Sequence, residues 1–181
     1  PSGAVVTGLG KETRCMQCHQ GRESTVSVDA AIEAAAPVDD DTVTAGLGFK
    51  NVHYFAAGAT LFGDEVKGAY QYAGKYYQGK FGHEMGFDAC QGCHNPHSLE
   101  VKTEGCAACH EGTVDEYRMA GSSKDYDGDG TLEGIKEEIA GLQALAYAAL
   151  QAYAATTIGT AIVYDAAAYP YFFIDTNANG L

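Results

Sequence analysis

The sequence predicts a mostly irregular and α-helical fold, with little regular structure before residue 119 and an amphipathic helix in the C-terminal part. The six cysteines all lie in one short motif that occurs three times. The 181 residues include 23 glycines and no tryptophan, and 46 % are hydrophobic. Apolar residues recur every three or four positions only beyond Thr131. We therefore expect a motif-bearing region over 1–118 and a helical segment over 119–181.

The repeated motif is Cys-x-x-Cys-His, the attachment signature of c-type haem, in which two thiols bond covalently to the porphyrin and the histidine ligates the iron. The residues are Cys15, Cys18 and His19; Cys90, Cys93 and His94; and Cys106, Cys109 and His110. Zinc bound by the last four cysteines, disulfides, or a thioredoxin-like dithiol are alternatives, but none needs the trailing histidine. We expect three haems c, whose apolar faces organise the fold in place of side-chain core.

Three histidines lie outside the motifs, which supplies one spare imidazole for each iron. They are His53, His83 and His97. The matched number favours bis-histidine ligation, which leaves each iron six-coordinate, low-spin and without an open substrate position. Such haems transfer electrons, so the chain is not expected to be an enzyme. Methionine is the other common sixth ligand, and the candidates are Met16, Met85 and Met119.

His97 follows His94 by only three residues, so it is expected to serve a neighbouring haem, which is either the first or the third. Pro96 restricts the backbone between the two histidines and favours an extended conformation at the residue before it. The second and third motifs follow each other closely along the chain, so their haems are expected to lie close together.

The region before residue 119 is expected to hold short elements. A short helix should surround the first motif, and the stretch Asp29–Asp41 should be a loop because Pro37 and the aspartate run break regular structure. His53 is expected in a helical turn within Asn51–Phe62. The tyrosines of Gly63–Gly86 should pack on haem edges and hairpin faces.

The C-terminal segment contains an apolar stripe at helical spacing, formed by Ile135, Ile139, Leu142, Leu145, Ala149 and Tyr153. This pattern predicts an amphipathic helix of about five turns. The segment lacks cysteine and histidine. Its helix is therefore expected either to cover a haem or to pack on another subunit.

Two acidic turns resemble the opening half of an EF-hand calcium loop. The first provides Asp125, Asp127 and Asp129, then a turn glycine, Thr131 and Glu133. Lys136 replaces the usual bidentate glutamate at position 12, so Glu137 or Glu133 would have to compensate. The second provides Asp175, Asn177 and Asn179, and the chain stops soon after, which suggests a piece of a longer protein. We expect Ca²⁺ at these turns.

Charge and hydropathy exclude several classes of partner. The net charge of -13 disfavours nucleic acid and anionic membranes, because both attract clustered lysine and arginine. No apolar run approaches the roughly 20 residues that span a bilayer, so no membrane span is expected.

The motifs and spare histidines together resemble the multihaem c-type cytochromes, above all extracytoplasmic bis-histidine members. Arg14–Arg22, Val52–Gly63 and Asp88–His110 carry the resemblance. It implies electron transport in the periplasm, at the cell surface or outside the cell. The implied partners are redox proteins, or copies of the chain that form an oligomer or a filament through haem contacts. A multihaem reductase with one open haem is the alternative function, and a structural or adhesion module stabilised by calcium is another.

Overall fold

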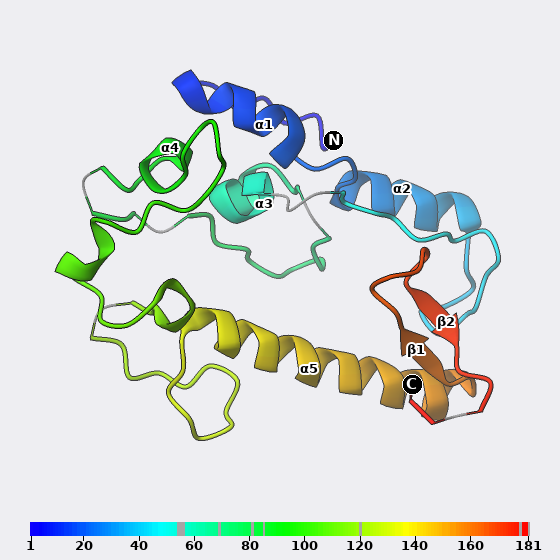
Figure 1. Cartoon of the computed structure of the whole chain (residues 1–181). Coiled ribbons are helices and arrows are strands. Elements are labelled where there is room, and N and C mark those ends of the chain that lie inside the picture. Colours follow the sequence, from blue (N-terminus) through cyan, green and yellow to red (C-terminus); the bar gives the residue numbers. More distant parts are fainter. Residues whose placement is uncertain are drawn as a thin grey trace. The chain divides into compact units, whose positions relative to one another are not determined.

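The computed structural model describes residues 1–53, 57–68, 70–80, 82–84, 86–119, 121–177 and 179–180. The chain divides into two compact units, Pro1–Lys102 and Thr103–Leu181. The first unit therefore holds the first two motifs, and the second unit holds the third. The sequence suggested a boundary after residue 118 instead, and one haem-binding region for all three motifs stays a prediction. As predicted, most of the described chain is irregular, with few helices and a small sheet (Figure 1).

Three short helices carry or support the motifs of the first unit. A 3₁₀ helix, Gly10–Glu12, leads into α1, Thr13–His19, which contains the first motif. Helix α3, Ala57–Phe62, packs on α1 and continues into a 3₁₀ helix, Gly63–Glu65. The contact needs Gly58, because a Cβ there would lie 3.2 Å from the Cα of Gln20. Helix α4, Cys90–Cys93, contains the second motif.

Helix α2, Thr25–Ala35, corrects the expectation of a loop over Asp29–Asp41. Ser24 caps its N-terminus in a reciprocal arrangement with Ser27, which satisfies backbone donors that the first turn leaves unpaired. The helix ends at Ala36, whose φ is +47°, directly before Pro37. The loop is therefore confined to the residues after the helix, because the Ser24 cap outweighs the weak propensity of this stretch.

Two further expectations for the first unit are wrong. His53 is not in a helical turn, since its φ is +62° and α3 begins only at Ala57; residues 54–56 lie outside the described residues. The described residues of 63–86 contain turns and no strand, so the tyrosines there do not form hairpin faces. The backbone N–H of Tyr77, for example, donates to Asp64 Oδ1 at 2.9 Å and not to a neighbouring strand.

The second unit is organised along α5, Ile135–Tyr153. Two 3₁₀ helices, Cys106–Ala108 and Val114–Glu116, precede it, and the π-helical turn Ala154–Ile158 follows it. Strands β1, Ile162–Tyr164, and β2, Phe172–Ile174, then pair antiparallel, with Val163 opposite Phe173.

The hairpin lies beside the end of α5 (Figure 1), and polar side chains on the last turns of that helix hold it. The Gln151 side-chain amide donates to the carbonyl of Ile162 at 3.2 Å, and the Tyr147 hydroxyl accepts from the backbone N–H of Tyr164 at 2.9 Å. The sequence patterns did not predict this sheet.

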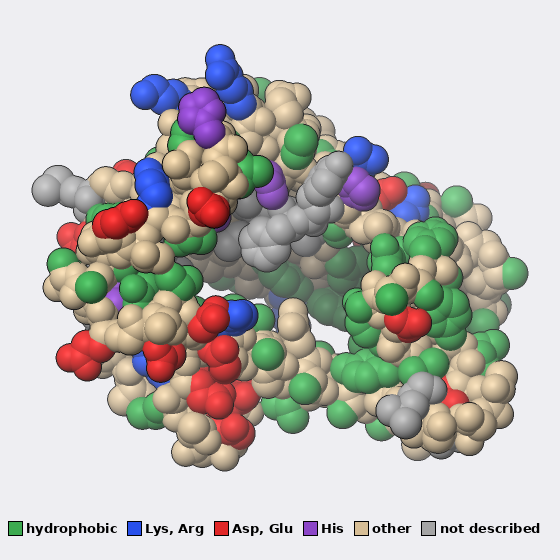
Figure 2. Space-filling model, viewed as in Figure 1, with side chains coloured by type: hydrophobic (Ala, Val, Ile, Leu, Met, Phe, Trp, Pro, Cys, Tyr) green, Lys and Arg blue, Asp and Glu red, His purple; other side chains and the backbone are tan. Residues whose placement is uncertain are grey.

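The described residues bury very little apolar surface of their own. Their buried hydrophobic side chains are Met16 and Ala154. On α5 most of the predicted stripe is exposed by about half, at Ile135, Ile139, Leu142, Leu145 and Tyr153. Figure 2 shows hydrophobic side chains over the β1–β2 hairpin and acidic side chains over the loop before α5. A chain with so little core needs other apolar groups to pack against.

No helix among the described residues is long and apolar enough to cross a membrane.

Candidate functional site

Each Cys-x-x-Cys-His motif forms a single helical turn. The turns are the last part of α1, helix α4, and the 3₁₀ helix Cys106–Ala108. Residues three apart in such a turn lie on one face, so both thiols of a motif point to the same side. None of the six cysteines is in a disulfide, and none is fully buried. Each turn thus presents two reachable sulfurs and an adjacent imidazole, as covalent haem attachment requires.

Met16 lies inside the first motif, on α1. It is only 7 % exposed and lines a small cavity with Leu9, Phe62 and Val66. Cys15 and His19 do not line that cavity. Met16 is therefore a packing residue of the α1–α3 contact, and its position argues against its use as an iron ligand.

Glu12 connects the first motif to the second. Its Oε1 accepts a hydrogen bond from the backbone N–H of Cys90, which lies 78 positions further along the chain. Burial of the Cys90 thiol, followed by the hydrogen bond and negative charge of Glu12, raises the pKa of that thiol to about 12. The charge of Cys15 raises it further, so the first thiols of the two motifs lie near each other.

A tight loop orients the histidine of the second motif. The His94 Nδ1 lies 3.0 Å from the carbonyl oxygen of Leu99. Because a carbonyl can only accept, Nδ1 carries the proton and the Nε2 lone pair is left for a metal. Lys102 closes the loop by donating its backbone N–H to the carbonyl of Cys93 at 2.7 Å.

Leu99 holds this geometry at a cost. Its φ is +64°, a left-handed conformation that disfavours side chains other than glycine, and its own side chain is 72 % exposed. Its N–H bonds the carbonyl of Asn95 at 2.8 Å. The strained backbone thus aims a carbonyl at the imidazole of His94, which is the kind of site where strain serves function.

Tyr117 supports the third motif. Its ring stacks on the His110 imidazole, with 4.9 Å between ring centroids and 27° between the planes. Burial raises the pKa of the Tyr117 hydroxyl, and contact with Cys106 raises it further. The carbonyl of Tyr117 accepts from the N–H of Ile135 at 2.9 Å, which joins this motif to the start of α5.

The three histidines outside the motifs all lie in the first unit. The residue before His53, Val52, accepts a backbone bond from Arg22 at 2.7 Å, shortly after the first motif. The His83 ring meets the Phe87 ring edge-on at 5.8 Å, just before the second motif.

The turn that contains His97 is closed by Asn95, whose Oδ1 accepts the backbone N–H of His97 at 2.9 Å. Among the methionine alternatives, Met119 is 68 % exposed, and Met85 lies outside the described residues.

The two acidic loops share one hydrogen-bond pattern. In the first, Asp125 Oδ2 accepts from the N–H of Gly130 at 2.8 Å; in the second, Asp175 Oδ2 accepts from that of Gly180 at 2.7 Å. Asp127 Oδ1 also accepts from the N–H of Asp129 in the first loop, and Asn177 Oδ1 accepts from the N–H of Asn179 in the second, each at 3.2 Å. The N–H bonds from Gly130 and Gly128 hold the pKa of Asp125 below its ordinary value. The repeated sequence therefore folds as a repeated structure.

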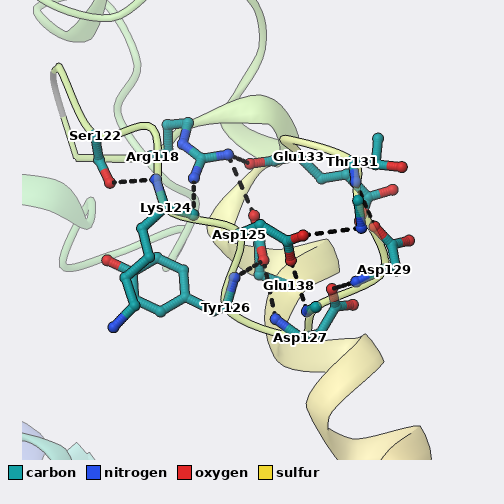
Figure 3. A network of polar contacts seen from close by, with 12 residues as sticks. Arg118, Ser122, Lys124, Asp125, Tyr126, Asp127, Asp129, Thr131, Glu133 and Glu138 are labelled. Atoms are coloured by element: carbon teal, nitrogen blue, oxygen red, sulfur yellow. Dashed lines mark hydrogen bonds and ion pairs between the residues drawn. The ribbon is translucent and has the colours of Figure 1, made fainter.

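Glu138, which the sequence reasoning missed, completes the first acidic loop (Figure 3). It is fully buried, and its carboxylate lies within 4.8 Å of those of Asp125 and Asp127. Its Oε2 accepts from the N–H of Tyr126 at 2.6 Å, and its Oε1 pairs with Arg118 at 3.2 Å. The position of Glu138 could have indicated this role, because it is the fourth residue of a helix that starts at Ile135 and so points back toward the preceding loop.

A second carboxylate group adjoins the first and uses Asp127, Asp129 and Glu133. Loss of solvation, followed by the charges of Asp129 and Asp127, raises the pKa of Glu133. Glu137, one of the two residues expected to compensate for Lys136, is in neither group, and its Oε2 is buried without a hydrogen-bond partner. Lys136 itself bonds Asp115 at 2.6 Å, which raises the pKa of the lysine.

The residues present fit haem c. Paired thiols outside any disulfide, a neighbouring imidazole whose Nε2 is left for a metal at His94, and exposed apolar side chains are the features that a covalently held porphyrin needs.

Comparison with known proteins gives the same class. Over 195 residues the chain is 32 % identical to the C-type polyheme cytochrome OmcB of Geobacter sulfurreducens, a match that covers 92 % of this chain and 22 % of OmcB. Over 185 residues it is 32 % identical to the C-type polyheme cytochrome OmcC of the same species, covering 92 % of this chain and 21 % of OmcC. No family model and no solved structure matches. The chain spans about a fifth of these relatives and is related to the multihaem c-type cytochromes.

Proposed function

We propose that the chain transfers electrons through three covalently bound c-type haems, each ligated by two histidines. The observation that carries the proposal is the combination of three thiol-bearing helical turns with the burial of almost no apolar side chains among the described residues. The printed description of OmcB and OmcC as polyheme cytochromes supports it. Haem supplies a one-electron change at iron when it is bound.

The residues of the chain hold and tune these groups. The six cysteines anchor the porphyrins, and His19, His94 and His110 are the proximal ligands. The Leu99 carbonyl fixes the tautomer of His94 and increases its basicity, which favours ferric iron. Tyr117 fixes the ring plane of His110 by stacking.

The distal ligands in this proposal are His53, His83 and His97. None of the three is fully buried, and His83 and His97 are exposed, so their imidazoles can reach a porphyrin without breaking a core. With both axial positions filled, the irons offer no site for a substrate, which makes this chain a carrier and not an enzyme.

We also propose Ca²⁺ at the two acidic loops. Oxygen ligands from aspartate and asparagine at alternate positions suit this hard cation. Asp125 and Asp127 would be joined by the buried Glu138, which takes the part that the sequence gave to Glu137. Metal content measured after exhaustive dialysis tests this, and Asp125→Asn and Asp175→Asn should each remove one bound ion.

The compartment that suits this chemistry is extracytoplasmic. Covalent haem attachment of this class and acidic calcium loops are both compatible with the periplasm or the cell surface. Protease accessibility on intact cells that express the full-length protein separates these two locations.

Replacing the distal histidines one at a time tests the ligation. His53→Ala, His83→Ala and His97→Ala should each convert one haem from low-spin to high-spin, as read by EPR and optical spectra. Met119→Leu is the matched control, because an exposed methionine that ligates nothing should leave all spectra unchanged. Bis-histidine ligation would be contradicted if Met119→Leu produced high-spin iron and one of the histidine variants did not.

A further inference from the structure

The first and second motifs, far apart in sequence, meet through one carboxylate. Glu12 ends the 3₁₀ helix that leads into α1, and its Oε1 accepts from the backbone N–H of Cys90, the first residue of α4. Both residues belong to the first compact unit. The contact therefore joins two parts of the same unit.

The helical geometry places the attachment residues on the joined surfaces. The backbone is helical from Gly10 to His19, so Glu12, Cys15 and His19 share one face at spacings of three and four. The face that carries the first haem attachment therefore points toward the N-terminus of α4. Ala89, the residue before α4, offers no side-chain cap, so Glu12 satisfies a helix donor that would otherwise lack one.

A second observation agrees with this arrangement. The charge of Cys15 contributes to the raised pKa of the Cys90 thiol, which requires the two sulfurs to be near each other. Gly92, inside α4, packs so tightly on the preceding loop that a Cβ would lie 2.3 Å from the carbonyl oxygen of Gly86. Helix α4 is thus held from two sides, by its own loop and by Glu12.

We propose that Glu12 is a positioning residue that holds the attachment sites of the first and second haems against each other, so that these two haems form a coupled pair within residues 1–102. The inference rests on the proposed function, since it needs haem at both motifs. It adds a connection that chain order does not suggest, because the second motif is much nearer to the third in sequence. The acceptor oxygen of Glu12 positions α4 through the hydrogen bond to Cys90, and the negative charge of its carboxylate is a separate contribution.

The test uses the full chain with its haems attached. Glu12→Ala removes both acceptor and charge, and Glu12→Gln keeps an acceptor oxygen but removes the charge. Glu33→Ala is the matched control, an exposed glutamate on α2 of the same unit. Haem content is read by intact mass, haem–haem coupling by the bisignate circular dichroism of the Soret band, and reduction potentials by spectroelectrochemistry.

We expect Glu12→Ala to lose most of the bisignate signal while it keeps three haems and low-spin spectra. Glu12→Gln should keep the signal but raise the potentials of the coupled pair, because a negative charge near ferric iron is lost. If Glu12→Ala does not mature, Glu12→Asp, whose shorter side chain retracts the carboxylate, should show the same loss. Unchanged coupling in the shortened variant, or an equal loss in Glu33→Ala, would overturn the inference. A chain without three low-spin haems would instead overturn the proposed function.

Discussion

The reduction potential of the second haem should depend on the backbone conformation of Leu99. The Leu99 carbonyl lies 3.0 Å from His94 Nδ1 only because this residue adopts a φ of +64°. Leu99→Pro cannot adopt that angle, because the proline ring fixes φ near −65°. It also removes the N–H that bonds Asn95 at 2.8 Å. Leu99→Gly accepts positive φ readily and keeps both hydrogen bonds.

The size of the effect follows from the one hydrogen bond. A neutral hydrogen bond contributes about 1 kcal/mol net. The bond to His94 strengthens the imidazole as a donor to iron and stabilises the ferric state more than the ferrous state. If most of that energy is differential, Leu99→Pro raises the potential of the second haem by about 40 mV, since a tenfold change in a one-electron equilibrium is about 59 mV.

Spectroelectrochemical titration of wild type, Leu99→Pro and Leu99→Gly measures this directly. One of the three one-electron steps should move upward in the proline variant, and none should move in the glycine variant. The glycine variant should also be slightly more stable, because the left-handed conformation costs leucine about 1 kcal/mol. Equal potentials in the proline variant and wild type would refute the role of the Leu99 carbonyl.

Three further predictions concern the acidic loop and α5, and hydrogen exchange of the α5 amides measures each. Glu138→Ala should lower the stability of this region by about 3 kcal/mol, the low end for a broken buried pair, because Arg118 remains partly exposed; unchanged exchange would contradict this. Gly141→Ala should destabilise despite the usual helix gain, since its Cβ would fall 1.6 Å from Asp127 Oδ2; slower exchange would show that the loop does not pack there. The lowered pKa of Asp125 gives the calcium-free loop stability that is complete above its ordinary pKa of 3.8 and lost as pH falls through the lower folded value; Asp125→Asn should abolish this pH dependence, and an unaltered profile would argue against it.

The local features of this molecule could be predicted from the sequence. The Cys-x-x-Cys-His turns depend on residues within one helical turn, and the α5 pattern depends on spacing alone, so both follow from nearby residues. The acidic loops also fold alike because their aspartates bond their own backbone. The Ser24 cap of α2 is also a local signal, which the prediction of a loop from Pro37 and the aspartate run did not include.

The remaining features depend on contacts that no local pattern encodes. Glu12 meets Cys90 across 78 positions, and nothing near either residue indicates the other. The positive φ of Leu99 arises from the closed loop around it, not from its residue type. Glu138 joins the acidic loop because α5 begins at Ile135, and the spacing of apolar residues gives that starting point only approximately.

The central claim is that three covalent haems with two histidines on each iron complete this fold. Intact mass of the matured full-length chain, combined with its EPR spectrum, tests that claim most directly. We predict a mass increase of three haems and an EPR spectrum that is entirely low-spin. Fewer than three attached haems, or a stoichiometric high-spin iron in the intact protein, would contradict it.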